Sequence, residues 1–253
     1  MLLKKRKPRR YFFFDPSLIS LGKEKHAQYM AASPFPHAVF DNFLPPDVAN
    51  KIYDEFPPSD FKNFKTLNST GHKHKLAKLS YSYFEGVSPF CRQVLAEFNG
   101  MVFLEFLENL TGIEPLIADP HFKGGSFHQI LRGGSLGIHA DFNRDERRLL
   151  DRRINVLFYV NKDWREEYGG NLELWDEKMK TRVVKVSPIL NRCVIFSTTR
   201  TSYHGHPDPL TCPEGMSRKS LAFYYYTNLD PNIKPKESHS TLWQNRPQEN
   251  EYL

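Results

Sequence analysis

The chain has 253 residues, 40% of them hydrophobic and 25% charged, which is an ordinary globular composition and excludes a largely disordered chain. No apolar run is long enough to span a membrane or form a signal-peptide core, and the three cysteines are odd in number and widely spaced, so we expect a cytoplasmic protein with reduced thiols. The net charge of +6 includes a basic cluster at residues 4–10, which we interpret as a solvated tail because no interleaved aromatic residues suggest a nucleic-acid-binding module.

Two helices are predicted in the N-terminal half. The first begins near Pro46 and ends before the prolines at positions 57 and 58, because apolar residues fall four apart on one face. These residues are Val48, Ile52 and Phe56. The second begins at Ser88, a capping residue followed by proline, and ends near Gly112. Its core-facing residues are expected to be Phe90, Val94, Phe98, Met101 and Val102.

The polar stretch between these helices contains His72-Lys73-His74. Two histidines separated by one residue could bind a metal, but these lie among lysines with no third ligand nearby. We therefore expect a solvated surface loop.

From Pro120 onward, short runs of β-branched and aromatic residues are separated by Gly, Pro, Asp or Asn, a pattern typical of β-strands. The expected strands are residues 122–131, 136–141, 154–161, 172–175, 182–186, 193–197 and 220–226. Helices followed by many short strands predict an α+β fold in which the helices pack on a closed β-core.

One predicted strand carries a pair of metal-ligating residues. His139 and Asp141 are two apart in the segment 136–141, so they project from the same face of that strand. A third ligand, His204, follows the predicted strand 193–197. Two histidines and one carboxylate leave the opposite side of a metal open, which is the facial triad of non-haem iron oxygenases. Zinc with a bound water uses the same ligand types and stays open as the alternative metal.

A second histidine and aspartate pair, at residues 206 and 208, competes with the first. Proline stands between its two members and another proline follows, which disfavours regular strand pairing. The distal ligand is the more open choice, because His204 and His206 are themselves two apart and share a face. We favour His204 and place His206 beside the ligands or on the substrate side.

Further motifs accompany these residues along the chain. They are His139-Ala140-Asp141, RRINVLFYVNKDW at 152–164, GGNLEL at 169–174, NRCVIF at 191–196, SYHGH at 202–206 and RKS at 218–220. Together they resemble iron(II)/2-oxoglutarate-dependent dioxygenases, most closely the prolyl-hydroxylase-like branch, over about residues 121–227. The resemblance implies a double-stranded β-helix (jelly-roll, cupin-like) core with N-terminal supporting helices. It also implies iron(II), 2-oxoglutarate and dioxygen, with ascorbate as a candidate addition.

The resemblance assigns roles to further residues. In this family a basic residue on the strand after the distal histidine pairs with the 5-carboxylate of 2-oxoglutarate, and Arg218 and Ser220 match that arrangement. A buried planar guanidinium suits a carboxylate, and a hydroxyl two residues along the strand points the same way. By similarity, Tyr159 hydrogen-bonds the same carboxylate, and His128 or Gln129 faces the co-substrate from a neighbouring strand.

These observations predict one catalytic domain over residues 1–253. It divides into a basic tail and helical support at 1–117, a jelly-roll core with the iron and 2-oxoglutarate site at 118–230, and a polar tail at 231–253. The expected reaction is hydroxylation of an unactivated C–H bond. A prolyl or peptidyl residue is the first candidate substrate, and a small metabolite, amino acid, sugar or glycan is the alternative. A cupin-like metal-binding protein or enzyme that does not use 2-oxoglutarate, and so does not need Arg218, is the rival class. Nothing in the sequence indicates an oligomeric state.

Overall fold

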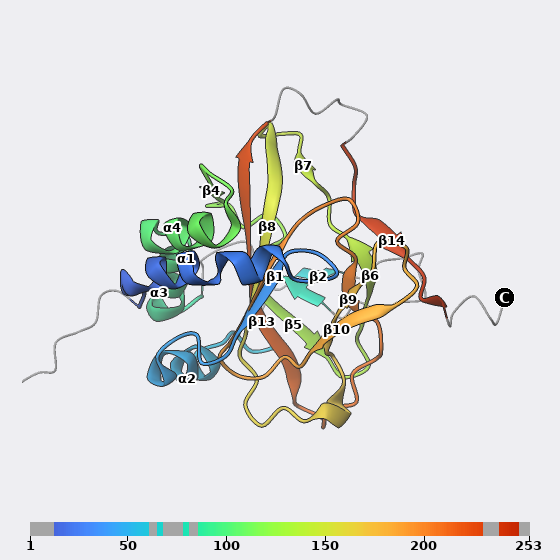
Figure 1. The fold of residues 1–253 in the computed structure, drawn as a ribbon. Helices are drawn as coiled ribbons and strands as arrows, with labels where there is room; N and C mark the ends of the chain where they lie inside the picture. The colour runs from blue at the N-terminus through green and yellow to red at the C-terminus, as the bar shows by residue number, and fades with distance from the viewer. Residues whose placement is uncertain (1–12, 61–64, 68–77, 81–85, 230–237, 248–253) are drawn as a thin grey trace, which may run out of the picture.

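The computed structural model describes residues 13–60, 65–67, 78–80, 86–229 and 238–247. In these ranges the chain forms three layers, with helices on one side, a nine-stranded sheet in the middle and a five-stranded sheet on the other side (Figure 1). The helices are α1 (Ser17–Met30), α2 (Pro46–Asp54), α3 (Pro89–Phe98) and α4 (Met101–Thr111), with a short 3-10 helix η1 (Glu166–Tyr168). The predicted α+β class is confirmed.

The larger sheet has the order β1-β11-β8-β13-β5-β3-β2, with β4 beside β13 and β7 beside β8. Its strands are β1 (His37–Phe40), β2 (Lys65–Leu67), β3 (Lys78–Ser80), β4 (Ile117–Ala118), β5 (Ser126–Leu131), β7 (Arg144–Asp145), β8 (Leu150–Tyr159), β11 (Arg192–Ser197) and β13 (Ser217–Asn228). The smaller sheet has the order β10-β9-β12-β6-β14. Its strands are β6 (Leu136–Ala140), β9 (Leu172–Trp175), β10 (Arg182–Val186), β12 (His204–His206) and β14 (Leu242–Gln244).

Each of the seven predicted strand segments contains a strand, but the prediction of a closed β-core is wrong. The described residues form two separate antiparallel sheets that face each other, each with its own edge strands. Alternating apolar residues show which side chains turn inward, but they do not show which strands pair at the edges. One apolar core lies between the helices and the larger sheet, where Phe98 stacks on Phe223 with ring centroids 4.3 Å apart. A second core, which includes Tyr159, lies between the two sheets.

The predicted helix 88–112 is two helices. Its start is confirmed, since the Ser88 hydroxyl accepts a hydrogen bond from the Cys91 backbone N–H at 3.0 Å. α3 ends at Phe98, and α4 begins after Gly100 because asparagine and glycine at positions 99 and 100 favour a break. The break turns Met101 outward, so its predicted core position is wrong and its side chain is 82% exposed. α4 ends at the expected Gly112, which adopts a left-handed conformation.

Helix α1 has no predicted counterpart, because few of its residues face the core. Gly22 and Tyr29 are its only buried positions. Gly22 lies against α4, and a Cβ there would be 2.6 Å from the Phe106 carbonyl oxygen. Close approach of two helix backbones, rather than an apolar stripe, therefore places α1.

Cys91, Cys193 and Cys212 are buried free thiols, as expected. The basic cluster at 4–10 and the His72-Lys73-His74 triplet lie outside the described residues. Within the described ranges, no helix has the length and apolar character needed to cross a membrane. The stretch 231–253, expected as a polar tail, contributes strand β14 to the smaller sheet.

Candidate functional site

Three side chains that could hold a metal ion meet on the inner face of the smaller sheet. Strand β12 pairs with β6 in antiparallel register and places His204 directly opposite His139, while Asp141 follows the end of β6. Asp141 Oδ1 lies 3.6 Å from His139 Nε2, and Asp141 Oδ2 lies 3.6 Å from His204 Nε2. Ligand atoms of the three residues all fall within 4.8 Å of one another, and no other such group of histidine, cysteine and acidic side chains occurs among the described residues.

The two histidines present their Nε2 atoms to the centre of this group. His139 Nδ1 lies 2.9 Å from the Gly137 carbonyl oxygen, and His204 Nδ1 lies 2.9 Å from the Ser202 carbonyl oxygen. A carbonyl oxygen only accepts, so each Nδ1 must donate, which leaves an Nε2 lone pair for a cation. Burial, together with the neighbouring His139, lowers the pKa of His204 to about 4, so His204 is neutral near pH 7. The donor set therefore fits a divalent cation.

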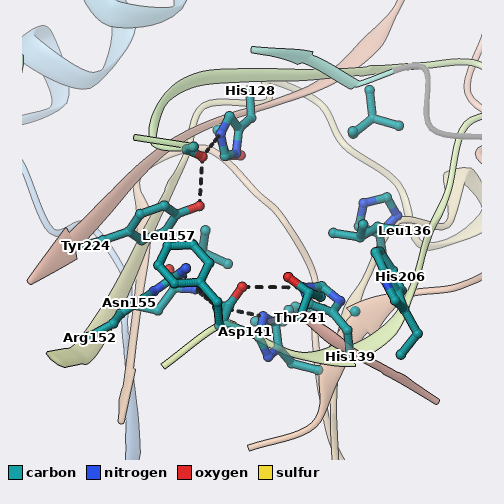
Figure 2. Close-up of a pocket in the computed structure, with 18 of the residues that line it drawn as sticks. His128, Leu136, His139, Asp141, Arg152, Asn155, Leu157, His206, Tyr224 and Thr241 are labelled. Atoms are coloured by element: carbon teal, nitrogen blue, oxygen red, sulfur yellow. Dashed lines mark hydrogen bonds and ion pairs between the residues drawn. The ribbon is translucent and has the colours of Figure 1, made fainter. Parts of the chain in front are cut away.

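The third group, Asp141, is held as a carboxylate by strand β8. Its Oδ2 accepts hydrogen bonds from Arg152 Nη2 at 2.7 Å and Asn155 Nδ2 at 3.0 Å (Figure 2). Burial acts to raise the pKa of Asp141, but the Arg152 charge and the two histidines outweigh it and hold the pKa well below its usual range. Arg152 is itself stacked on Tyr224, with its guanidinium carbon 3.5 Å from the ring centroid.

Arg152 and Asn155 were absent from the sequence-based site. The one available signal was a charged residue at the start of a long buried strand, where an arginine needs a partner. Sequence reasoning supplied no way to identify that partner as Asp141.

The competing pair at 206 and 208 does not form a ligand set. The Asp208 side chain is 60% exposed and its Oδ1 accepts a hydrogen bond from Arg246 at 2.8 Å. His206 is buried and lines the same cavity as His204, but it lies across that cavity from Arg152 and Asn155 (Figure 2). Its place is consistent with the substrate-side position expected for it.

A buried arginine side chain lies in the same cavity as the His-Asp-His group. Arg218, on β13, donates from Nε to the Gly170 carbonyl oxygen at 2.7 Å and from Nη2 to the Tyr159 hydroxyl at 3.1 Å. Ser220 is paired with Tyr159 across strands β13 and β8, and it lines the cavity together with Arg218. Burial raises the pKa of Tyr159, so its phenol stays protonated and can donate a hydrogen bond to an anion.

The structure separates the two residues expected beside the co-substrate. His128 lines the cavity, and its Nε2 lies 2.8 Å from the Gly124 carbonyl oxygen. Gln129, the next residue on β5, does not line the cavity, and its Nε2 donates to the Ser217 hydroxyl at 2.7 Å. Consecutive side chains on a strand point to opposite faces, so only one of these two neighbours can face the cavity.

The C-terminal strand β14 closes one side of the cavity, which has a volume of about 280 Å³. It pairs with β6 so that Trp243 lies opposite His139, and the two ring centroids are 4.9 Å apart. Thr241 and Trp243 both line the cavity. Neither was a predicted site residue, because nothing near them in the sequence suggests a ligand.

Comparison with known proteins agrees with this geometry. A sequence model described as the 2OG-Fe(II) oxygenase superfamily matches residues 125–226. Solved structures with a similar fold include a prolyl-4-hydroxylase of Pseudomonas putida, with 19% identity, a TM-score of 0.57, and 81% of this chain and 98% of that chain covered.

Two further structures are similar. One is a Trichoplax adhaerens prolyl hydroxylase in complex with a hypoxia inducible factor peptide fragment, with 15% identity, a TM-score of 0.59, and 88% and 94% of the two chains covered. The other is HygX of Streptomyces hygroscopicus with nickel, 2-oxoglutarate and hygromycin B bound, with 11% identity, a TM-score of 0.53, and 90% and 98% covered. At these identities the likeness shows the fold, and it supports the expected jelly-roll core.

Proposed function

We propose that this chain uses iron(II), 2-oxoglutarate and dioxygen to hydroxylate a C–H bond of a peptidyl proline, because residues 125–226 match the sequence model of the 2OG-Fe(II) oxygenase superfamily. The observation that carries the proposal is one cavity of about 280 Å³ that contains both the His-Asp-His group and the buried guanidinium of Arg218. A metal centre alone would not need that second, buried charge.

His139, Asp141 and His204 would hold the iron. Two ligand atoms each about 2.1 Å from one cation lie roughly 3.0–3.6 Å apart when the angle between them is about 90–120°. Asp141 Oδ1 lies 3.6 Å from His139 Nε2, at the upper end of that range, whereas the 3.6 Å distance from His204 Nε2 is to Oδ2. Since Asp141 Oδ2 already accepts two hydrogen bonds, Oδ1 is the oxygen left for the cation. When bound, iron supplies the redox chemistry that activates dioxygen while 2-oxoglutarate loses carbon dioxide and becomes succinate.

Arg218, Ser220 and Tyr159 would bind the 5-carboxylate of 2-oxoglutarate. The guanidinium is fixed by the Gly170 carbonyl and the Tyr159 hydroxyl, so little side-chain freedom is lost when a carboxylate binds. The protonated phenol and the Ser220 hydroxyl each add a donor. This end of the cavity lies on the larger sheet, so the co-substrate would span from β13 to the ligands on β6 and β12.

A prolyl residue as substrate is supported by the two prolyl hydroxylases among the similar structures. A small glycoside-like metabolite is the second candidate, supported by the likeness to HygX with hygromycin B bound. We also propose that residues 1–253 act as one catalytic domain. Its three buried free thiols support a reducing compartment such as the cytoplasm.

The test is iron-dependent formation of succinate from 2-oxoglutarate by purified protein, with and without proline-containing peptides. We expect His139→Ala to abolish turnover and Arg218→Ala to raise the KM for 2-oxoglutarate by about 30–100-fold, the loss of a buried charged hydrogen bond. Arg165→Ala is the matched control, because that side chain is 68% exposed.

Each rival class gives a different result. Wild-type protein that forms no succinate under any of these conditions would contradict the oxygenase proposal. Metal-dependent activity that survives Arg218→Ala would favour a cupin-like enzyme that does not use 2-oxoglutarate. Mass spectrometry of the peptide, which gains one oxygen atom on proline, tests the substrate.

A further inference from the structure

The C-terminal strand β14 brings an indole ring to the mouth of the cavity. We propose that Trp243 is the substrate-facing wall of this oxygenase and that the substrate packs a single aliphatic ring, the pyrrolidine of a peptidyl proline, against its indole. The inference rests on the function proposed above, and it adds a specificity-determining residue from outside the segment 125–226 that matches the superfamily.

The segment that carries Trp243 is fastened on both sides of β14. Before the strand, the His239 backbone N–H donates to Asn143 Oδ1 at 2.9 Å. Along the strand, Leu242, Trp243 and Gln244 pair with Ala140, His139 and Ile138 of β6. After the strand, Arg246 forms the ion pair with Asp208 at 2.8 Å. Three separate attachments hold this segment beside the ligand strand, so the indole has a defined position.

The position of Trp243 suits contact with a ligand. Its ring lies 4.9 Å from the His139 ring at an interplanar angle of 38°, and its side chain lines the cavity while it keeps 36% of its surface exposed. A tryptophan that is partly exposed at the rim of a cavity has apolar area still to bury, and aromatic residues in such places commonly anchor ligands.

The size of the cavity limits what can enter. A volume of about 280 Å³ is at or below the small end of ligand pockets, which run from roughly 300 to 1,000 Å³. The same space must also hold 2-oxoglutarate, so only one side-chain-sized group of the substrate fits beside it. The rest of a peptide would lie outside, over the exposed edge of Trp243.

The charges of the cavity favour an uncharged group. Arg152 is paired with Asp141, and Arg218 is assigned to the co-substrate carboxylate. The remaining walls of the cavity include Leu136, Leu157 and Phe142. Apart from histidines, no ionisable side chain among the described lining residues is left unassigned for an ionic substrate, whereas an aliphatic ring can pack between these side chains and the indole.

A structural role for Trp243 predicts something different. If the indole only supported His139, its removal would weaken metal binding, and peptide binding would fall as a consequence. If it contacts the substrate, its removal weakens peptide binding while the affinities for metal and 2-oxoglutarate stay close to those of the wild type. Separate binding measurements for the three ligands distinguish the two roles.

The experiment compares wild type, Trp243→Ala, Trp243→Phe and Gln244→Ala by calorimetry without oxygen. Mn(II), then 2-oxoglutarate, then a short peptide with one central proline are added in turn, and the same peptide with alanine in place of proline is the ligand control. Gln244 is the matched residue, because it lies next on β14 but does not line the cavity.

We expect the Kd of the proline peptide to rise about tenfold or more in Trp243→Ala, to recover partly in Trp243→Phe and to stay unchanged in Gln244→Ala, with less than about a twofold change for Mn(II) and 2-oxoglutarate. An unchanged peptide Kd in Trp243→Ala, or an equal loss of Mn(II) affinity, would overturn the inference. So would a wild type that forms succinate yet does not bind the proline peptide more tightly than the alanine peptide. Absence of any iron-dependent succinate formation by wild type would instead remove the proposed function.

Discussion

At the scale of single residues, Asp141 shows how this site keeps one carboxylate oriented. Two donors from β8 take the same oxygen, and the Arg152 charge keeps the group ionised although it is buried. An unpaired buried carboxylate would take up a proton instead. The ligand geometry therefore depends on a strand that supplies no ligand.

Gly170 has a comparable role at the other end of the cavity. It has a φ of +70°, and a Cβ added there would lie 2.9 Å from Arg218 Cδ and 2.6 Å from Leu210 Cδ2. Gly170 therefore makes room for the Arg218 side chain, whose Nε donates to the Gly170 carbonyl oxygen. A motif noticed in the sequence only as part of a resemblance has a direct steric explanation.

This explanation gives a prediction for Gly170→Ala. The methyl group should displace Arg218 and raise the KM for 2-oxoglutarate by roughly tenfold or more, since a displaced charged hydrogen bond costs about 1.5–3 kcal/mol. Gly133→Ala is the matched control, because Gly133 has a φ of +79° but nothing within 4 Å of an added Cβ. Equal KM values for the two variants would contradict the steric role and leave only backbone strain.

At the scale of elements, the pairing of β12 with β6 assembles the ligand group. The register sets His204 opposite His139, and a bulge follows before His206 pairs with Leu136. The register of this pairing therefore determines which of the two histidines lies beside His139. The sequence spacing of His204 and His206 does not contain that information.

Helix α1 illustrates a contact that local pattern does not record. Its packing on α4 depends on Gly22, whose added Cβ would lie 2.6 Å from a backbone carbonyl of α4 that cannot move away easily. We expect Gly22→Ala to destabilise the fold by about 1–3 kcal/mol through overpacking, despite a gain of about 1 kcal/mol in helix propensity.

The measurement is urea unfolding of Gly22→Ala beside Lys23→Ala, an exposed neighbour on the same helix. Lys23→Ala should unfold at nearly the wild-type urea concentration. A Gly22→Ala protein that is more stable than wild type would show that α1 can move away from α4 without loss.

At the scale of the whole molecule, the proposed site joins the two sheets. The three candidate metal ligands belong to the smaller sheet and its adjoining loop, whereas Arg218 and Ser220 belong to the larger sheet. Ligands that bind only the folded state stabilise it, by roughly 2.7 kcal/mol at a concentration 100 times the Kd. A metal with 2-oxoglutarate should therefore act as a bridge between the layers.

We accordingly expect Mn(II) and 2-oxoglutarate together to raise the Tm by several degrees, since about 1 kcal/mol corresponds to roughly 2–4 °C in a chain of this size. Arg218→Ala should keep the shift caused by Mn(II) and lose the additional shift caused by 2-oxoglutarate. His139→Ala should lose both. Differential scanning fluorimetry measures all three, and an unaltered 2-oxoglutarate shift in Arg218→Ala would contradict the assignment of the carboxylate site.

The sequence by itself determined the candidate metal ligands, the starts of the helices near Pro46 and at Ser88, and the approximate positions of seven strands. Each of these depends on patterns within about ten residues, such as the two-residue spacing of His139 and Asp141. Only the tertiary structure decided that β12 lies beside β6, that Arg152 bonds Asp141, and that β14 returns to place Trp243 beside the metal-ligating group. Those contacts join segments far apart in the chain, and their free energy comes from burial and pairing that exist only once the sheets have formed.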